Sequence, residues 1–263
     1  MASQSCPIEL TTSMSEAPRS KLSDVLEGLK HGVLLAVAGG IVLLPSSGIS
    51  SVAGSTTQHH AKVSGDAVAN QNSPRADFGS LSPSADARHV ADWVAGSNDN
   101  KSLPFAILDK RGARVYIFNA QARLMGSSLV LLGSAAGDDS VAGIGNRPLT
   151  AVLPQERTTA AGRFISEPGH DEAGDKVVWV DYEAALAMHR VKVIDPKERR
   201  FERLATDSIE DKRISNGCIN VPIAFFDSVV EPELGRSRAI VYVLPEIKPI
   251  QLVFPEAYRW AFP

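Results

Sequence analysis

Short apolar runs separated by turn residues recur between residues 104 and 244, and they constrain the fold more than any other feature of the chain. Residues 104–108 read PFAIL, residues 109–112 form the turn signal DKRG, and residues 114–118 read RVYIF. Two apolar runs joined by such a turn predict a β-hairpin. Further strands are expected at residues 124–133, 176–180 and 239–244.

Two stretches have helical character. Residues 83–97 place Val90, Trp93 and Val94 at the three- and four-residue spacing of a helix face. Residues 222–230 begin with a proline, which suits the first turn of a helix. Together with the strands, these stretches predict a β-rich α/β domain with short helices.

The chain divides into three regions. Its 263 residues suffice for one good-sized domain with extensions. Residues 83–263 are expected to form that domain, with its core at 103–246. Residues 54–82 are rich in Ser, Ala, Gln, Asn and Gly and predict a flexible linker. Residues 1–53 form the N-terminal segment.

The N-terminal segment holds an apolar run at residues 32–44. Its 13 residues are fewer than the roughly 20 that a comfortable membrane span needs, and they match the core of an export signal. Residues 51–53 (SVA) offer a small-residue cleavage site. We therefore expect export to the periplasm or cell envelope, with the run acting as a cleaved signal or as a membrane anchor. A buried strand or helix remains the alternative.

Only two cysteines occur, Cys6 and Cys218, too few for a disulfide framework. Cys218 lies in the stretch RISNGCINV at residues 213–221. Gly217 permits a tight turn or a close backbone approach, and a backbone N–H at Gly217 or Cys218 suits an oxyanion formed on a substrate. A thiol nucleophile also needs a base. A buried cysteine that acts only as a small apolar side chain is the alternative.

The sequence SNGCIN at residues 215–220 resembles the signature of the L,D-transpeptidase (YkuD-type) catalytic domain family, which has Ser/Thr-His-Gly-Cys, an apolar residue, then Asn or Arg. Residues 157–164 are similar to the family's Thr-Pro-x-Gly-x-Phe segment, and His189 falls where the family has its upstream histidine. Residues 240–245 resemble its closing strand. The resemblance implies a β-sandwich-like mixed sheet with short helices.

The resemblance also implies roles for individual residues. Cys218 is the expected nucleophile and His189 its base, with Ser215 orienting the imidazole and Gly217 contributing to the oxyanion site. Asn216, Asn220, Arg213 and Arg190 are the expected substrate-binding residues. Asn216 stands where the family has His, and a plain ion pair is an equal alternative for Arg213.

The implied reaction is acyl transfer on peptidoglycan stem peptides through a Cys218 thioester, which forms 3→3 crosslinks or attaches another amine. Hydrolysis of the same bond by an L,D-carboxypeptidase and a non-catalytic peptidoglycan-binding protein are the alternatives. A closed zinc site needs four ligands, so Cys218 and His189 alone do not predict one. We expect no cofactor or metal. The net charge of −3 gives no reason to expect a nucleic-acid partner.

Overall fold

The computed structural model describes residues 74–193 and 195–260. Residues 1–53, with Cys6 and the apolar run at 32–44, lie outside the described residues, as does most of the predicted linker. The described part of that linker contains the buried side chains of Ala76 and Phe78, so the packed domain begins before residue 83. No helix in the described ranges is long and apolar enough to cross a membrane.

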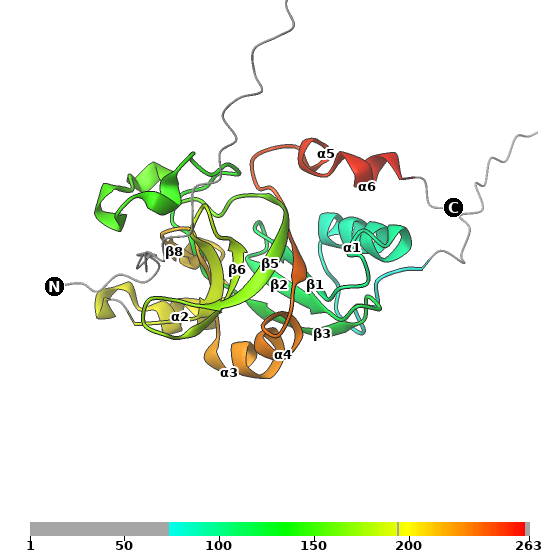
Figure 1. Ribbon diagram of the computed structural model, residues 1–263, viewed down its shortest axis with the longest axis horizontal. Coiled ribbons are helices and arrows are strands. Elements are labelled where there is room, and N and C mark those ends of the chain that lie inside the picture. Colours follow the sequence, from blue (N-terminus) through cyan, green and yellow to red (C-terminus); the bar gives the residue numbers. More distant parts are fainter. Residues whose placement is uncertain (1–73, 194, 261–263) are drawn as a thin grey trace, which may run out of the picture. The chain divides into compact units, whose positions relative to one another are not determined.

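A mixed sheet forms the centre of the described domain (Figure 1). Its eight strands have the order β3-β2-β1-β10-β5-β6-β7-β9, and β4 and β8 form a separate pair. The pairs β1–β10, β7–β9 and β4–β8 are parallel, and the other pairs are antiparallel. The strands are β1 (Phe105–Asp109), β2 (Arg114–Phe118), β3 (Leu124–Leu129), β4 (Leu132–Gly133), β5 (Gly162–His170), β6 (Lys176–Asp181), β7 (Leu186–Arg190), β8 (Arg213–Ser215), β9 (Ile219–Val221) and β10 (Ala239–Val243).

The helices are short apart from the first. Ser84 caps α1 by accepting a hydrogen bond from the N–H of Ala87, and Asn98 ends it in a left-handed conformation. The α-helices are α1 (Ala85–Ser97), α2 (Arg200–Ala205), α3 (Ile223–Phe225), α4 (Glu231–Leu234), α5 (Ile250–Val253) and α6 (Pro255–Arg259). A π-helical segment, η6 (Phe226–Val230), joins α3 to α4, and the 3₁₀ turns are η1 (Ile144–Asn146), η2 (Leu149–Ala151), η3 (Pro154–Glu156), η4 (Pro196–Glu198) and η5 (Glu210–Lys212).

The two faces of the sheet bury two separate cores, because successive side chains of a strand point to opposite faces. Phe105 and Ile107 of β1 belong to the core that α1, α5 and α6 cover. Ala106 and Leu108 belong to the second core, which α4 and the π-helical segment cover (Figure 1). Side chains of β6, β7 and β9 join this second core as well, so the sheet curves around it.

The structure confirms the β-rich α/β class, the hairpin at 104–118 and the helix at 83–97. The helical stretch after Pro222 runs to Leu234, beyond the predicted residue 230. Its buried face consists of Phe226, Val230 and Leu234, whereas Ala224 is exposed. The π-helical hydrogen bonds change the residue spacing along this stretch, which the 3.6-residue pattern does not anticipate.

Candidate active site

Cys218 lies in a tight turn between β8 and β9, and two neighbouring side chains hold the turn in place. The hydroxyl of Ser215 donates to the carbonyl oxygen of Cys218 at 2.7 Å and accepts from the N–H of Gly217 at 3.1 Å. The amide of Asn220 donates to the same carbonyl oxygen at 3.2 Å. All of these contacts are buried, so they fix the backbone on both sides of the sulfur.

Gly217 is required by the shape of this turn. Its φ is +132°, a value that residues with a side chain rarely adopt. A Cβ atom at this position would also lie 2.9 Å from the carbonyl oxygen of Thr158. The prediction that a glycine before Cys218 allows a close backbone approach is therefore confirmed.

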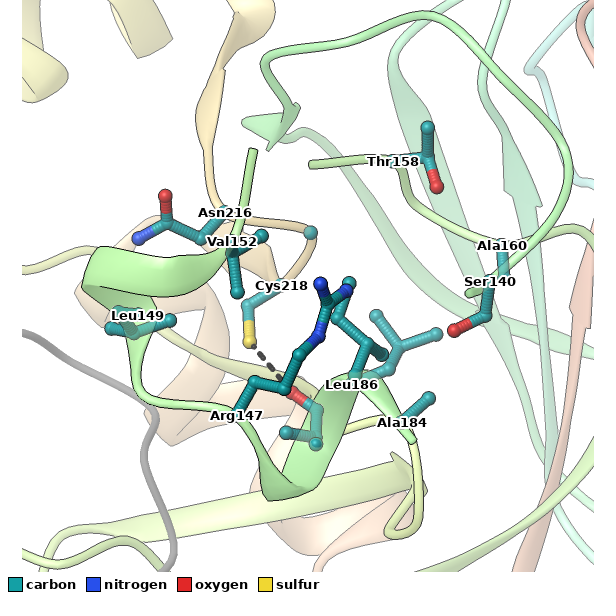
Figure 2. A pocket seen from close by; sticks show the side chains of 14 residues that line it. Ser140, Arg147, Leu149, Val152, Thr158, Ala160, Ala184, Leu186, Asn216 and Cys218 are labelled. Atoms are coloured by element: carbon teal, nitrogen blue, oxygen red, sulfur yellow. Dashed lines mark hydrogen bonds between the residues drawn. The ribbon is translucent and has the colours of Figure 1, made fainter. Parts of the chain in front are cut away.

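The side chain of Cys218 is 6% exposed and lines a pocket (Figure 2). Its Sγ donates to the carbonyl oxygen of Ala185, 3.4 Å away, in the turn between β6 and β7. Residues 140–158, which we call the covering loop and which contain η1, η2 and η3, supply one wall. The cavity measures only about 40 Å³, far below the several hundred cubic ångströms of a typical ligand site. The space beside the sulfur is therefore small.

His189 lies on β7, the strand next to β9, and is 3% exposed. The parallel register pairs Met188 with Ile219 and His189 with Asn220. Continuing this register one residue back places Ala187 opposite Cys218, and these two side chains share a small apolar cluster. Side chains two residues apart on a strand point to the same face, so His189 is on the face that carries Cys218.

The imidazole of His189 has a defined hydrogen-bonding state. Its Nδ1 lies 2.7 Å from the carbonyl oxygen of Arg190. A carbonyl oxygen only accepts, so Nδ1 carries the hydrogen in this contact. In the neutral ring Nε2 is then the proton acceptor. His189 is not among the residues that line the cavity.

No protein-family model matches the chain, and no curated protein matches it either. The case for a function therefore depends on the residues of this site and on their geometry.

Four residues that we expected at the site have other partners. Arg213 forms an ion pair with Glu246, which is the alternative that the sequence left open. Arg190 donates from Nε to Asp227 at 2.7 Å and lies over the ring of Phe226. The Arg213–Glu246 pair is mostly buried and the Arg190–Asp227 pair is more exposed, and neither arginine lines the pocket.

Asn220 and Ser215 are buried and serve the Cys218 turn. Besides its bond to Cys218, Asn220 accepts from Nη1 of Arg200 at 2.9 Å, and Arg200 is itself buried. Both polar ends of the Asn220 side chain thus have partners within the protein. Ser215 bonds within the turn and has no bond to the imidazole of His189. Because the N–H of Gly217 is already bonded to Ser215, it is not directed at an oxyanion.

Asn216, Gly217 and Cys218 line the cavity. Two further residues that line the cavity were not predicted from the sequence. Arg147 comes from the covering loop, and Ala185 presents its carbonyl oxygen to the sulfur at a φ of +52°. Arg147 lies between glycine, asparagine and proline residues without hydrophobic periodicity, so only the folded structure shows which way it faces.

A buried ionic cluster lies beneath the covering loop. The ammonium of Lys110 donates to the carboxylate of Asp138 at 2.7 Å and to the carbonyl oxygen of Thr159 at 2.7 Å. Burial alone would raise the pKa of Asp138. The hydrogen bond from Lys110 and those from three backbone N–H groups at residues 246–248 outweigh burial and lower this pKa to about 2.

This cluster is connected to the Cys218 turn. The carbonyl oxygen of Thr159 accepts from Lys110, and the hydroxyl of Thr159 donates to the carbonyl oxygen of Gly217 at 2.7 Å.

In the described residues, no group of three or more His, Cys, Asp or Glu side chains is placed to hold a metal ion.

Proposed function

We propose that the protein is a cysteine-dependent L,D-transpeptidase of the YkuD type that acts on peptidoglycan stem peptides in the cell envelope. The observation that carries the proposal is the position of His189 on the strand beside Cys218, on the same face, with Nδ1 bonded to the carbonyl oxygen of Arg190. This arrangement supports a thiol–imidazole pair whose third member is a backbone carbonyl.

The reaction would begin with transfer of the Cys218 proton to Nε2 of His189. The sulfur attacks the carbonyl of the third stem residue, and the bond to the terminal D-alanine breaks. The departing amine takes the proton back from the imidazolium, which leaves a thioester on Cys218. An amine of a second stem then attacks the thioester, forms an amide and releases the thiol. Water in place of the amine gives the L,D-carboxypeptidase reaction.

In the structure, the Cys218 thiol donates its proton to a backbone carbonyl oxygen. Its hydrogen bond to the carbonyl oxygen of Ala185 uses the sulfur proton, and this contact must break before the proton moves to His189. The same opening of the covering loop that admits a substrate would allow this change, because the loop closes against the Ala185 turn. A Cβ on Gly145 of the loop would lie 2.3 Å from the carbonyl oxygen of Glu183.

The test is incubation of the purified protein with a stem tetrapeptide and an acceptor stem. Intact-protein mass spectrometry should show that the wild type gains the mass of the donor minus D-alanine. Cys218→Ser lacks the sulfur and should not form this thioester adduct. His189→Gln should form the adduct at least a hundredfold more slowly, as expected when a positioned base is removed.

Analysis of the products distinguishes the possible reactions. Crosslinked dimers indicate transfer, tripeptides without dimers indicate hydrolysis, and binding of stem peptides without any adduct indicates a non-catalytic binding protein. Absence of both adduct and binding would refute the proposed function.

A further inference from the structure

Arg147 carries buried hydrogen-bond donors that have no partner. Its Nε and Nη2 atoms are inaccessible to solvent and make no hydrogen bond. Across the described residues, the only other buried side-chain atom in this condition is Nε of Arg157, at the end of the same covering loop. A buried donor without a partner is unfavourable, and more so when it is charged, so such a pair of atoms needs an explanation.

The rest of the guanidinium is engaged. Nη1 of Arg147 lies 3.1 Å from Oε2 of Glu156, and the same oxygen accepts from the N–H of Leu153 at 2.9 Å. Glu156 thus satisfies one end of the arginine and anchors it to η3. The Nε–Nη2 edge of the guanidinium has no hydrogen-bond partner. Two parallel donors on one such edge match the two oxygens of a carboxylate.

The guanidinium of Arg147 lies at the cavity of Cys218. Arg147 and Cys218 both line the pocket, and Figure 2 shows the guanidinium in the middle of the lining side chains. Among the described residues that line it, Arg147 is the one with a charge, and the others are apolar, small or neutral polar. A single positive charge within low-polarity walls favours a negatively charged group of the ligand.

We propose that Arg147 binds a carboxylate of the acyl donor, namely the C-terminal carboxylate of the residue that Cys218 displaces. The cavity is small, so the anion must lie close to the carbonyl that the sulfur attacks. In a peptide ending in D-alanine, this carboxylate is separated from that carbonyl only by the amide nitrogen and one carbon. Arg147 is then a specificity residue that selects the last peptide bond of a stem, and this assignment rests on the proposed function.

A pair of thiol reagents tests the anion site without any enzymatic turnover. Iodoacetate and iodoacetamide both alkylate a thiol with loss of iodide, but only iodoacetate carries a carboxylate. The rates at Cys218 are measured on the full chain by peptide mass spectrometry, which separates this residue from Cys6. We expect Arg147→Gln to lower the ratio of the iodoacetate rate to the iodoacetamide rate about tenfold, the value of one charged hydrogen-bonded contact.

Two further variants make the result specific. Arg147→Lys keeps the positive charge but loses the two parallel N–H donors. Its ratio of iodoacetate rate to iodoacetamide rate should therefore fall between those of the wild type and Arg147→Gln. Arg236→Gln removes an exposed arginine in the turn after α4 that does not line the pocket, and its ratio should equal that of the wild type. Equal ratios in the wild type and both Arg147 variants, or a native Cys218 that neither reagent reaches, would overturn the anion site.

The identity of the carboxylate is tested with two donor peptides, one with a free C-terminal carboxylate and one with a carboxamide. Wild-type protein should acylate faster with the free acid, and Arg147→Gln should remove that preference. A preference that persists in Arg147→Gln places the donor carboxylate elsewhere. If neither peptide acylates Cys218 while the iodoacetate preference depends on Arg147, the transpeptidase function fails and the anion site remains.

Discussion

The hydroxyl of Thr159 donates to the carbonyl oxygen of Gly217 at 2.7 Å, although the two residues are 58 positions apart in the sequence. The same hydroxyl accepts from the N–H of Gly133 at 2.9 Å. Thr159 therefore ties the end of the covering loop to β4 and to the Cys218 turn at once. Both backbone groups are buried, so the N–H of Gly133 and the carbonyl oxygen of Gly217 each depend on the Thr159 hydroxyl for a partner.

Thr159→Val keeps the shape of the side chain but removes the hydroxyl, which leaves a buried N–H and a buried carbonyl without partners. We expect the free energy of unfolding to fall by about 2–3 kcal/mol, measured by chemical denaturation. Thr150→Val, at an exposed position in η2, is the matched control and should change it by less than about 0.5 kcal/mol. Equal stability of the two variants would contradict the role given to Thr159.

Gly217→Ala should disrupt the Cys218 turn directly. The added Cβ meets the carbonyl oxygen of Thr158 at 2.9 Å, and φ is +132° at this residue. Strain of this kind costs on the order of 1–3 kcal/mol. Gly174→Ala is the control, since Gly174 also has a positive φ but a Cβ there would meet nothing within 4 Å. We expect Gly217→Ala to be the less stable variant in thermal unfolding and to alter the alkylation rate of Cys218, which Gly174→Ala leaves unchanged.

The sequence anticipated the elements whose signals are local. The hairpin around residues 109–112 follows from two apolar runs and a turn, and the helix at 83–97 follows from apolar residues at helical spacing. The glycine before Cys218 indicated a tight turn for the same reason, because its conformational freedom is a property of one residue. These features needed no information about distant parts of the chain.

The partners of the polar site residues were not predictable in this way. Asn220 occurs at a position that suggests a substrate contact, yet it bonds to the buried side chain of Arg200. Arg213 and Glu246 form an ion pair only because the fold brings β8 and the segment after β10 together. Such long-range pairs depend on the curvature of the sheet, which no local pattern encodes.

Ser215 offers a test of its revised role. If it holds the backbone turn and does not orient His189, the effects of the two residues on Cys218 alkylation should be independent. The factor by which His189→Gln slows alkylation should then be the same in the wild type and in Ser215→Ala. Ser215→Ala itself should lose about 1–2 kcal/mol of stability because Gly217 and Cys218 lose a buried partner. A strong non-additive effect in this double-mutant cycle would restore the orienting role.

The buried cluster of Lys110 and Asp138 predicts a specific dependence of stability on pH. The pKa of Asp138 is about 2 in the folded protein, below the ordinary value of 3.8. A carboxyl group with a lowered folded pKa stabilises the fold fully above its unfolded pKa, and this contribution is lost as the pH falls through the folded pKa. The contribution is thus complete at pH 7 and amounts to about 2–3 kcal/mol, from 1.36 kcal/mol per pKa unit.

Asp138→Asn removes this contribution. The difference in unfolding free energy between the wild type and Asp138→Asn should therefore be larger at pH 7 than at pH 3, by about 1 kcal/mol. Ser237→Ala, at an exposed position without a charge, should differ from the wild type equally at both pH values. Denaturant titrations at the two pH values measure each difference. An Asp138→Asn difference that stays constant between pH 7 and pH 3 would mean that the Lys110 contact does not hold Asp138 in its charged form.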